Sequence, residues 1–582
     1  MKPSPEFGLF AAGSALRTAR TSLRTARASL RTARATPGIA THKLGPVFSA
    51  VLCTIFTAAL WGTALYGVTS ASPAAAQTGS LSITEDPGPV PVAELAERRT
   101  RILDGMGSGI MILFGAEPKV FSNDVNYPYR QESNLFYLTG ISQPGATLVL
   151  VSGNRSQKEI LFLPRRDPAR EIWTGHMIGV EEARRRTGIT QVWPSEEFDA
   201  FVEAVLHGVA YEKRLSDDAG DYRAIGESVE NGTPVPVWLL ADASSRYGSR
   251  YPKALRFASE SARFPAVQIR LATGLFRDLR VVKSDWELQR LQRAVDITRL
   301  AQRAIMRRAS SQGGTRGPGG RGGTSATTGP AGPGGPGGTL NESVLDGIIL
   351  STYRTHGAHW GFPSIVASGP NATTLHYEEN NREIASGELV LADIGAAVGY
   401  YTADVTRTFP VGGVFSEAQR EIYEVVLEAH ARGVAAVRPG MTMRRVHEVA
   451  RKVIADGLLK LGLITSTSGN QYRMWYMHGT SHWIGLDVHD VGGRDMPFRP
   501  GMVITVEPGI YVREDTLVNL DDTSRNRALI EAIRPAFERY RNIGVRVEDD
   551  VLVTEDGHRV LSEGTPRTIE EIEAFMANPD GR

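Results

Sequence analysis

Four carboxylates in strings that otherwise read as buried strands constrain this chain more than any other feature of its sequence. Asp393 ends LVLAD, Asp404 lies in YTADVTRTFP, Glu507 lies in ITVEPGIY and Glu548 lies in GVRVEDD. An isolated carboxylate is costly to bury, so each of these side chains needs a positive partner. The fold of this region must therefore bring compensating charge to all of them.

Asp393 and Asp404 are predicted to lie on the two strands of one hairpin. ELVLADIGAAVGYYTADVTRTF contains two β-prone runs around residues 397–400, where Gly399 in the third place suits a type II turn. A turn centred between Val398 and Gly399 places Asp393 directly opposite Asp404, with Cα atoms within about 5.5 Å. Such like charges are destabilising unless a cation lies between them, so we expect a metal site. The alternative, two solvated strand acids, conflicts with the apolar LVLAD run.

A histidine cluster follows in MHGTSHWIGLDVHD. His478 and His482 are four residues apart, so they share a face on either a helix or a strand. With His489, three of the chain's 12 histidines fall within twelve residues, which exceeds chance clustering. A lone histidine here would more often be a core residue, and the cluster is therefore what indicates a site.

These strings together supply four carboxylates and one imidazole, a donor set made mostly of oxygen. We predict that this set holds two divalent cations, with the ligands Asp393, Asp404, His482, Glu507 and Glu548. Two such cations can generate a hydroxide nucleophile near neutral pH. The sequence therefore indicates a hydrolase.

The chain has 582 residues, too many for one core, and two folded domains are expected. Residues 93–275 are predicted to form a smaller α/β domain, and residues 276–582 a mixed α/β (α+β) domain with the carboxylates. The expected strands in the first domain are GIMILFG, LFYLTG, ATLVLVS and EILFLP. The expected helices are 93–105, 195–207, 253–273, 285–309 and about 340–356.

Two segments of the second domain are predicted to be insertions. Residues 311–338 are dominated by Gly, Pro, Ser and Thr, from which no packed core can form. Residues 513–541 are charged and partly helical in pattern, and they lie between the strings of Glu507 and Glu548. From that position, the second insertion is expected to shape the mouth of the site.

Residues 1–76 are predicted to be a targeting segment. An apolar run at 44–68 follows a basic stretch and is long enough to span a bilayer as a helix. Residues 74–76 are all alanine, which fits signal-peptidase cleavage. A cleaved signal and a membrane anchor both export the rest of the chain, so we expect a periplasmic or extracellular protein.

Charge and cysteine content exclude some classes of protein. Residues 1–76 hold eight basic residues and one acid, which leaves 57 basic and 63 acidic residues in the remainder. Nothing in that balance indicates a nucleic-acid partner. Cys53 is the only cysteine, so neither an internal disulfide nor a thiolate metal site is expected. The Arg-rich repeat at 15–35 is either a membrane-surface segment or a duplicated start, and residues 77–92 are a linker.

Several strings together resemble one metallopeptidase family, that of aminopeptidase P, prolidase, methionine aminopeptidase and creatinase. HGTSHWIGLDVHDVG, TADVTRTFPVGG and TVEPGIY are most similar to aminopeptidase P, and NYPYRQESNLFYLTGISQPGATLVL resembles its non-catalytic N-terminal domain. The resemblance covers roughly residues 95–575. It implies a C-terminal pita-bread catalytic domain and release of the first residue from peptides with proline in second position.

The resemblance also implies a role for each metal ligand. Asp393 would bind one ion alone, whereas Asp404 and Glu548 would bridge both ions. His482 and Glu507 would complete the coordination of the second ion. Both ions are expected to be Mn²⁺, and a hydroxide between them would attack the scissile carbonyl.

Further residues receive roles from the same resemblance. Glu507 would carry a proton from water to the leaving proline nitrogen. His376 would steady the tetrahedral intermediate, and His478 and His489 would contact the substrate. The metal carboxylates would be supported by the side chains of Arg546 and Tyr511.

Simpler interpretations of these residues remain open. Tyr511 would then be an ordinary strand aromatic, Arg546 a surface ion-pair partner and His376 a loop histidine. The chain also departs from its relatives after the IW of EIWTGHMIG, where His176 and Met177 replace arginines that relatives often carry at the active-site entrance.

Two other functions remain possible from the sequence. A prolidase would share the five ligands but cleave only Xaa-Pro dipeptides, and Ser481 and Trp483 beside His482 favour the aminopeptidase. A metal-free binding module should have lost ligands, whereas this chain keeps all five. The family resemblance also implies a homo-oligomer, either a dimer or a tetramer.

Overall fold

The computed structural model describes residues 82–152, 158–207, 211, 223–241, 250–264, 266–311 and 340–579. The predicted targeting segment with Cys53 lies outside these residues, as does the Gly/Pro-rich insertion from residue 312 onward. Within the described ranges, no helix combines the length and the apolar character that crossing a membrane requires.

The first domain is built on a six-stranded mixed sheet with the strand order β6-β5-β4-β1-β7-β8. Its strands are β1 (Gly109–Phe114), β4 (Thr147–Ser152), β5 (Lys158–Leu163), β6 (Gln191–Pro194), β7 (Val235–Leu239) and β8 (Val267–Leu271). The β1–β4 and β4–β5 pairs are antiparallel, and the β5–β6, β1–β7 and β7–β8 pairs are parallel.

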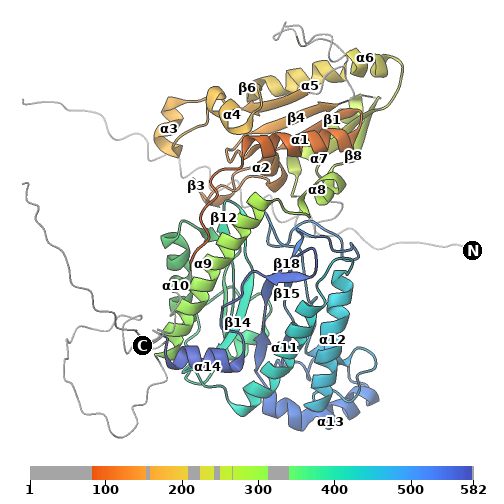
Figure 1. The fold of residues 1–582 in the computed structure, drawn as a ribbon. Helices are drawn as coiled ribbons and strands as arrows, with labels where there is room; N and C mark the ends of the chain where they lie inside the picture. The colour runs from red at the N-terminus through yellow and green to blue at the C-terminus, as the bar shows by residue number, and fades with distance from the viewer. Residues whose placement is uncertain are drawn as a thin grey trace, which may run out of the picture. The chain divides into compact units, whose positions relative to one another are not determined.

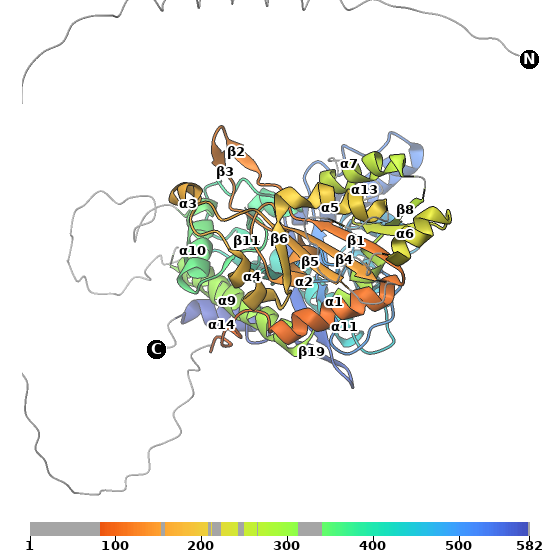
Figure 2. The same cartoon turned by 90° about the horizontal axis from the view of Figure 1, so that it is seen from above.

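Both faces of this sheet are covered by helices. Along β1, Met111 and Leu113 belong to one hydrophobic cluster and Ile110 and Ile112 to another, as the alternation of side chains along a strand requires. Figure 2 shows α1 (Val92–Met106) on one side of the sheet and α5 (Phe198–Leu206) on the other.

The remaining elements of this domain are short. They are β2 (Val120–Ser122), β3 (Val125–Asn126), α2 (Ser133–Thr139), α3 (Pro168–Thr174), α4 (Val180–Thr187), η1 (Ser195–Glu197), α6 (Arg223–Glu230), α7 (Pro252–Glu260), η4 (Ser261–Arg263) and α8 (Thr273–Arg280).

Two sequence predictions in this domain are wrong. LFYLTG is not a strand but most of helix α2, whose N-terminus is capped by the Glu132 carboxylate and whose C-terminus ends at left-handed Gly140. A six-residue apolar run does not distinguish a buried strand from a buried helix. The predicted helix 253–273 stops after α7 and η4, and its last part is strand β8.

The second domain begins with the long helix α9 (Asp285–Ser310), which the sequence predicts correctly. Ser284 and Glu287 form a capping box at its start. The other helices are α10 (Glu342–Thr355), η5 (Gly369–Thr373), α11 (Glu417–Ala435), α12 (Met443–Lys460), η6 (Gln471–Met474), α13 (Ser524–Tyr540) and α14 (Ile569–Ala577).

Small antiparallel sheets lie between these helices. Their strands are β9 (His359–Trp360), β10 (Ile365–Ser368), β11 (Leu389–Ile394), β12 (Ala396–Val398), β13 (Tyr401–Thr402), β14 (Val405–Pro410), β15 (Val503–Val506), β16 (Gly509–Tyr511), β17 (Gly544–Arg546), β18 (Asp549–Val553) and β19 (His558–Val560). Helix α9 packs along β12, β13 and β14, and α11 packs along β15, β16 and β17 (Figure 1).

The predicted hairpin of Asp393 and Asp404 forms, but its turn lies one residue later than expected. Gly399 and Tyr400 both have positive φ, at 53° and 76°, which is the pattern of a type I′ turn and not of type II. Type I′ turns match the twist of two-residue hairpins. The Tyr400 ring is further held in this strained conformation by stacking on Phe136, with ring centroids 4.1 Å apart.

This turn changes the partner of Asp393. Asp393 pairs with Thr406 and does not face Asp404 directly, so the predicted register is wrong. Moving the turn centre by one residue moves each pairing by two, an even number, so Asp393 and Asp404 stay on the same face. They are diagonal neighbours, which long side chains or a shared ion can still connect.

We expect Gly395 to be essential for this geometry. A Cβ at Gly395 would lie 1.9 Å from the carbonyl oxygen of Ala403, whereas a Cβ at Gly347 in α10 meets no atom within 4 Å. Gly395→Ala should therefore destabilise the domain by about 1–3 kcal/mol, measured as a lower Tm. Gly347→Ala, the matched control, should leave Tm unchanged or raise it. Equal Tm values for both variants would contradict this close approach.

Candidate metal centre

One pocket of the second domain collects almost all of the predicted site residues. The side chains that line it include Asp393, Asp404, His482, Glu507, Glu548, His376, His478, His489 and Arg546. Tyr511 is fully buried behind the pocket, where its hydroxyl contacts Arg546 and His478. The structure thus brings together residues that are up to 172 positions apart in the chain, from His376 to Glu548.

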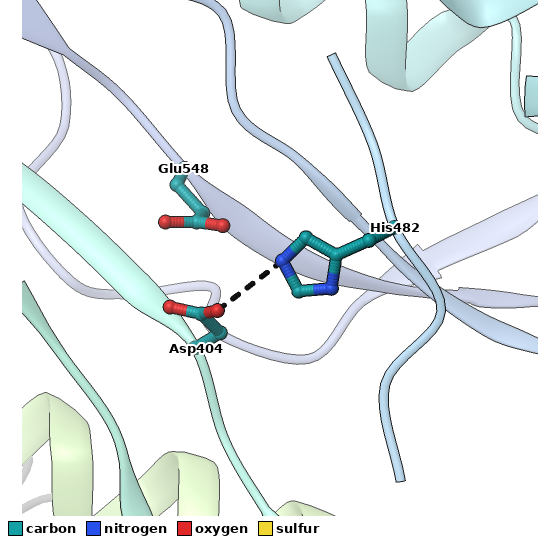
Figure 3. A group of neighbouring side chains, drawn as sticks. All are labelled: Asp404, His482 and Glu548. Atoms are coloured by element: carbon teal, nitrogen blue, oxygen red, sulfur yellow. Dashed lines mark ion pairs between the residues drawn. The ribbon is translucent and has the colours of Figure 1, made fainter. Parts of the chain in front are cut away.

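Asp404, His482 and Glu548 form the most compact group of potential ligands. One ligand atom from each lies within 4.8 Å of the others. Figure 3 shows the His482 imidazole directed at the two carboxylates. His482 Nε2 is 3.3 Å from Asp404 Oδ2 and 3.7 Å from Glu507 Oε1.

The orientation of the His482 ring suits a metal ligand. Its Nδ1 lies 3.1 Å from the carbonyl oxygen of Trp483, to which it donates a hydrogen bond. Nε2 is then the unprotonated nitrogen, and it faces the carboxylates. Burial lowers the pKa of His482 to about 4, with nearby His489 adding to the effect, so the ring is neutral at pH 7.

Three carboxylates lie where the pairing of strands is interrupted. The β15–β18 ladder ends at Val506 and Asp549, and the β16–β17 ladder resumes the same register at Gly509 and Arg546. Glu507 and Glu548 occupy the gap between these ladders. Asp404 lies in the corresponding gap between β13 and β14.

The backbone at these gaps finds other hydrogen-bond partners. The amides of Glu507 and Glu548 donate to the carbonyl oxygens of Thr480 and Thr406, at 2.8 and 3.2 Å. The amide of Asp404 donates to Oδ2 of the buried Asp550 at 3.0 Å. The ligand backbone is therefore fixed by contacts outside its own ladder, and the side chains are free to face the pocket.

Burial and mutual repulsion make these carboxyl groups hard to ionise. Burial raises the pKa of Glu507 to about 8, and the negative charge of Asp393 adds to this while Arg546 opposes it. Burial raises the pKa of Asp404 and of Glu548 well above the usual range, and neighbouring carboxylates raise both further. One arginine does not neutralise four clustered acids, so added positive charge would relieve the site.

Arg546 is a positive group that pairs directly with one of these carboxylates. Its guanidinium pairs with Asp393 Oδ2 and donates hydrogen bonds to Tyr511 Oη at 3.0 Å and to Thr406 Oγ1 at 3.1 Å. Thr406 Oγ1 in turn donates to Glu548 Oε2 at 2.6 Å. Arg546 is only 4% exposed, so the interpretation of this residue as a surface ion-pair partner is wrong.

His478 is connected to the same network. Its Nε2 lies 2.9 Å from Tyr511 Oη, and its Nδ1 lies 3.6 Å from Glu507 Oε2. Burial lowers the pKa of His478 to about 3, with Arg546 adding to the effect. His478 is therefore a neutral imidazole beside Glu507.

The donor atoms fit divalent cations. Oδ1 of Asp393 and Oδ1 of Asp404 are buried and have no hydrogen-bond partner within the described part of the chain. An acceptor that lacks a donor in such a place is costly unless a cation binds it. The oxygen-rich set with one imidazole suits Mn²⁺, Zn²⁺ and similar ions.

Other expectations for the site are wrong or incomplete. His478 and His482 lie in an irregular segment and not on a helix or a strand. None of the described residues 513–541 lines the pocket, because α13 packs against α11 through Arg539 and Tyr540, which both contact Glu421.

Some lining residues were missed from the sequence. Leu375, Gly479 and Arg494 line the pocket, and no spacing singles them out. Ser481, which the sequence marks only through the family resemblance, lines the pocket too. Thr406 had a usable signal, because it lies two residues after Asp404 and so on the same side of an extended chain.

Comparisons with known proteins agree with this geometry. Residues 289–555 match the model of metallopeptidase family M24, and residues 95–212 match the N-terminal domain of aminopeptidase P. The Xaa-Pro aminopeptidase of Haemophilus influenzae is 33% identical over 500 residues, which cover 84% of this chain and 98% of that protein. The Xaa-Pro aminopeptidase of Escherichia coli is 33% identical over 495 residues, which cover 83% of this chain and 97% of that protein.

The same relationship holds for solved structures. Aminopeptidase P from E. coli with the inhibitor Pro-Leu aligns with a TM-score of 0.66 and 30% identity, covering 85% of this chain and all of that one. This chain therefore belongs to metallopeptidase family M24. Within the family, its N-terminal and catalytic domains together match the architecture of aminopeptidase P.

The raised pKa of Glu507 predicts an unusual pH dependence of stability in the metal-free protein. Between the ordinary value of 4.5 and about 8, the folded state binds more protons than the unfolded state. The free energy of unfolding therefore falls as pH rises through this window. Below about pH 6.5 the lowered pKa values of His478 and His482 act in the opposite direction, so the fall is expected above that pH. We expect Tm of chelator-treated protein to fall between pH 6.5 and about 8, and Glu507→Gln or added Mn²⁺ to make the fall less steep. A metal-free Tm that rises between pH 6.5 and about 8 would contradict this electrostatic picture.

Thr406 is expected to support metal binding without touching the ions. Thr406→Val removes the hydrogen bonds to Glu548 and Arg546, and we expect metal affinity to fall about 10- to 100-fold. Isothermal titration with Mn²⁺ measures this affinity. Thr408→Val is the matched control, because Thr408 is equally buried on β14 but bonds only to the backbone of Arg546. Equal affinities for the two variants would show that Thr406 has no such role.

Proposed function

We propose that this protein is a metal-dependent exopeptidase that removes the first residue from peptides with proline in second position. The observation that carries this proposal is the convergence of four carboxylates and His482 on one pocket in a chain with the aminopeptidase P architecture. Proline forms a tertiary amide with a fixed φ, so such bonds resist ordinary peptidases and need a dedicated site.

The proposed ligand roles are those that the family resemblance implies, and the distances are compatible with them. Asp404 and Glu548, which lie within 4.8 Å of each other and of His482, are proposed to contact both ions. His482 and Glu507 lie on one side and would contact one ion, whereas Asp393, oriented by Arg546, would contact the other. Bound divalent ions would lower the pKa of a water molecule and polarise the scissile carbonyl.

The remaining side chains would handle protons and substrate. Glu507, whose carboxylate lies 3.6 Å from His478 and 3.7 Å from His482, would accept a proton from water and return it to the leaving nitrogen. Neutral His478 beside Glu507, with His376 and His489 on the exposed side of the pocket, would contact the substrate and the developing oxyanion. Arg546 and Tyr511 would hold Asp393 and His478 in place.

Three further proposals rest on sequence and family resemblance. Mn²⁺ is the proposed ion, because the donor set is rich in oxygen. The protein is proposed to be exported, by a cleaved signal or an anchor within residues 1–76, and to assemble as a homodimer or homotetramer. Detection of the native protein in cytosolic fractions would contradict export.

A pair of peptides separates this function from that of a prolidase. Chelator-stripped protein reloaded with Mn²⁺ should release arginine from Arg-Pro-Pro, and it should do so faster than it cleaves the dipeptide Ala-Pro. Asp404→Ala should reduce cleavage by at least about 10³-fold, because it removes a shared ligand. Cleavage of Ala-Pro alone would identify a prolidase, and metal binding without cleavage of either peptide would contradict the proposed substrate class.

A further inference from the structure

The loop that carries His376 is anchored by a buried carboxylate that no metal or catalytic role explains. His376 is exposed on the rim of the pocket, and it lies in segment 364–383, which comprises β10 and the chain that follows it toward β11. Glu342, the first residue of α10, is 0% exposed and faces this segment. Burying a carboxylate is costly without compensating hydrogen bonds, so Glu342 must be stabilised by its hydrogen-bond partners.

Glu342 accepts five hydrogen bonds, all from segment 364–383. Oε1 accepts from the Ser368 amide at 2.8 Å, from Ser368 Oγ at 2.7 Å and from Asn371 Nδ2 at 3.1 Å. Oε2 accepts from Tyr377 Oη at 2.7 Å and from the Arg382 amide at 2.9 Å. One carboxylate thus connects the beginning, the middle and the end of the segment.

Tyr377 brings this anchor next to the pocket. It directly follows His376, and Leu375 and His376 both line the pocket whereas Tyr377 is turned inward and buried. The hydroxyl of Tyr377 bonds to Glu342, so the carboxylate fixes the residue adjacent to His376. Within the described part of the chain the His376 side chain makes no hydrogen bond, so its position depends on its neighbours.

The backbone around Glu342 strengthens the connection. The Glu342 amide donates to the carbonyl oxygen of Arg382 at 3.0 Å, and the Ile384 amide donates to the carbonyl oxygen of Leu340 at 2.8 Å. The chain that enters α10 is therefore paired with the end of the same segment.

We propose that Glu342 is a positioning residue that holds His376 at the metal pocket by fixing segment 364–383. This inference rests on the proposed function, in which His376 contacts the substrate. Both oxygens of Glu342 must accept hydrogen bonds, which an amide cannot reproduce because its nitrogen only donates. In Glu342→Gln, the amide nitrogen is expected at the Oε2 position, because it meets one N–H donor there, the Arg382 amide, and two at the Oε1 position. The Tyr377 hydroxyl also bonds at Oε2, so the disturbance falls beside His376.

A double-mutant cycle with His376 tests this role. Glu342→Gln and Tyr377→Phe should each lower kcat about tenfold for an Xaa-Pro-Yaa peptide, with KM and the number of bound Mn²⁺ ions unchanged. In a His376→Ala background, the same substitutions should change kcat less than about twofold, because their effect passes through His376. An undiminished tenfold loss in that background would overturn the proposal, as would loss of bound ions.

Tyr423→Phe is the matched control. Tyr423 is also buried, and its hydroxyl donates a single hydrogen bond to the carbonyl oxygen of Arg567 at 2.7 Å, with no link to segment 364–383. This variant should keep the wild-type kcat. A loss equal to that of Tyr377→Phe would mean that any missing buried hydroxyl lowers activity and would overturn the proposal.

Hydrogen exchange provides a readout that needs no substrate. Amides of residues 369–379 should exchange faster in Glu342→Gln than in the wild type, whereas those of residues 503–507 should not change. If the wild type cleaves no Xaa-Pro peptide, the proposed function is wrong, and the exchange data alone decide the anchoring. Unchanged exchange over 369–379 would then overturn the role of Glu342.

Discussion

Repulsion among buried carboxylates is the constraint on which the catalytic domain depends. Asp404, Glu507 and Glu548 crowd one pocket, and burial together with mutual repulsion raises the pKa of each. The backbone that carries these three residues must be held firmly in place, since repulsion between the carboxylates would otherwise move them apart. Divalent cations convert this repulsion into binding free energy, because metal binding requires deprotonated carboxylates.

Polar side chains on the surrounding elements supply the necessary rigidity. Gln302 of α9 is fully buried and donates to the carbonyl oxygens of Ala392 and Val405, at 2.9 and 2.8 Å, next to Asp393 and Asp404. On the other side, Arg407 donates to the carbonyl oxygen of Glu548 at 2.6 Å and pairs with Asp549. Burial alone would raise the pKa of Asp549, but the Arg407 guanidinium holds it well below its usual range. The strands that carry the proposed ligands are therefore fixed by side chains that do not line the pocket.

Local sequence patterns indicate the five proposed ligands but not the residues that support them. The five proposed ligands can be found in the sequence because carboxylates in apolar strands and clustered histidines are unusual. Helix α9 can be found because its capping box and its apolar periodicity indicate the same helix. The sequence predicts the hairpin turn one residue too early, since the stacking of Tyr400 on Phe136 is a contact over 264 positions that no local pattern contains. Helix α2 was mistaken for a strand because its apolar run is too short to show a period. Glu342 and Asp550 gave no signal, because their roles depend on partners that are distant in sequence.

The proposed function requires that the five residues hold two ions and that both ions are needed for cleavage. Stepwise loading with Mn²⁺ tests this requirement. Chelator-stripped protein is loaded in steps, the bound metal is counted by elemental analysis, and cleavage of an Xaa-Pro-Yaa peptide is measured on the same samples. We expect two ions per chain at saturation, with activity complete only at that point. Saturation at a single ion, or full activity in protein that binds none, would contradict it.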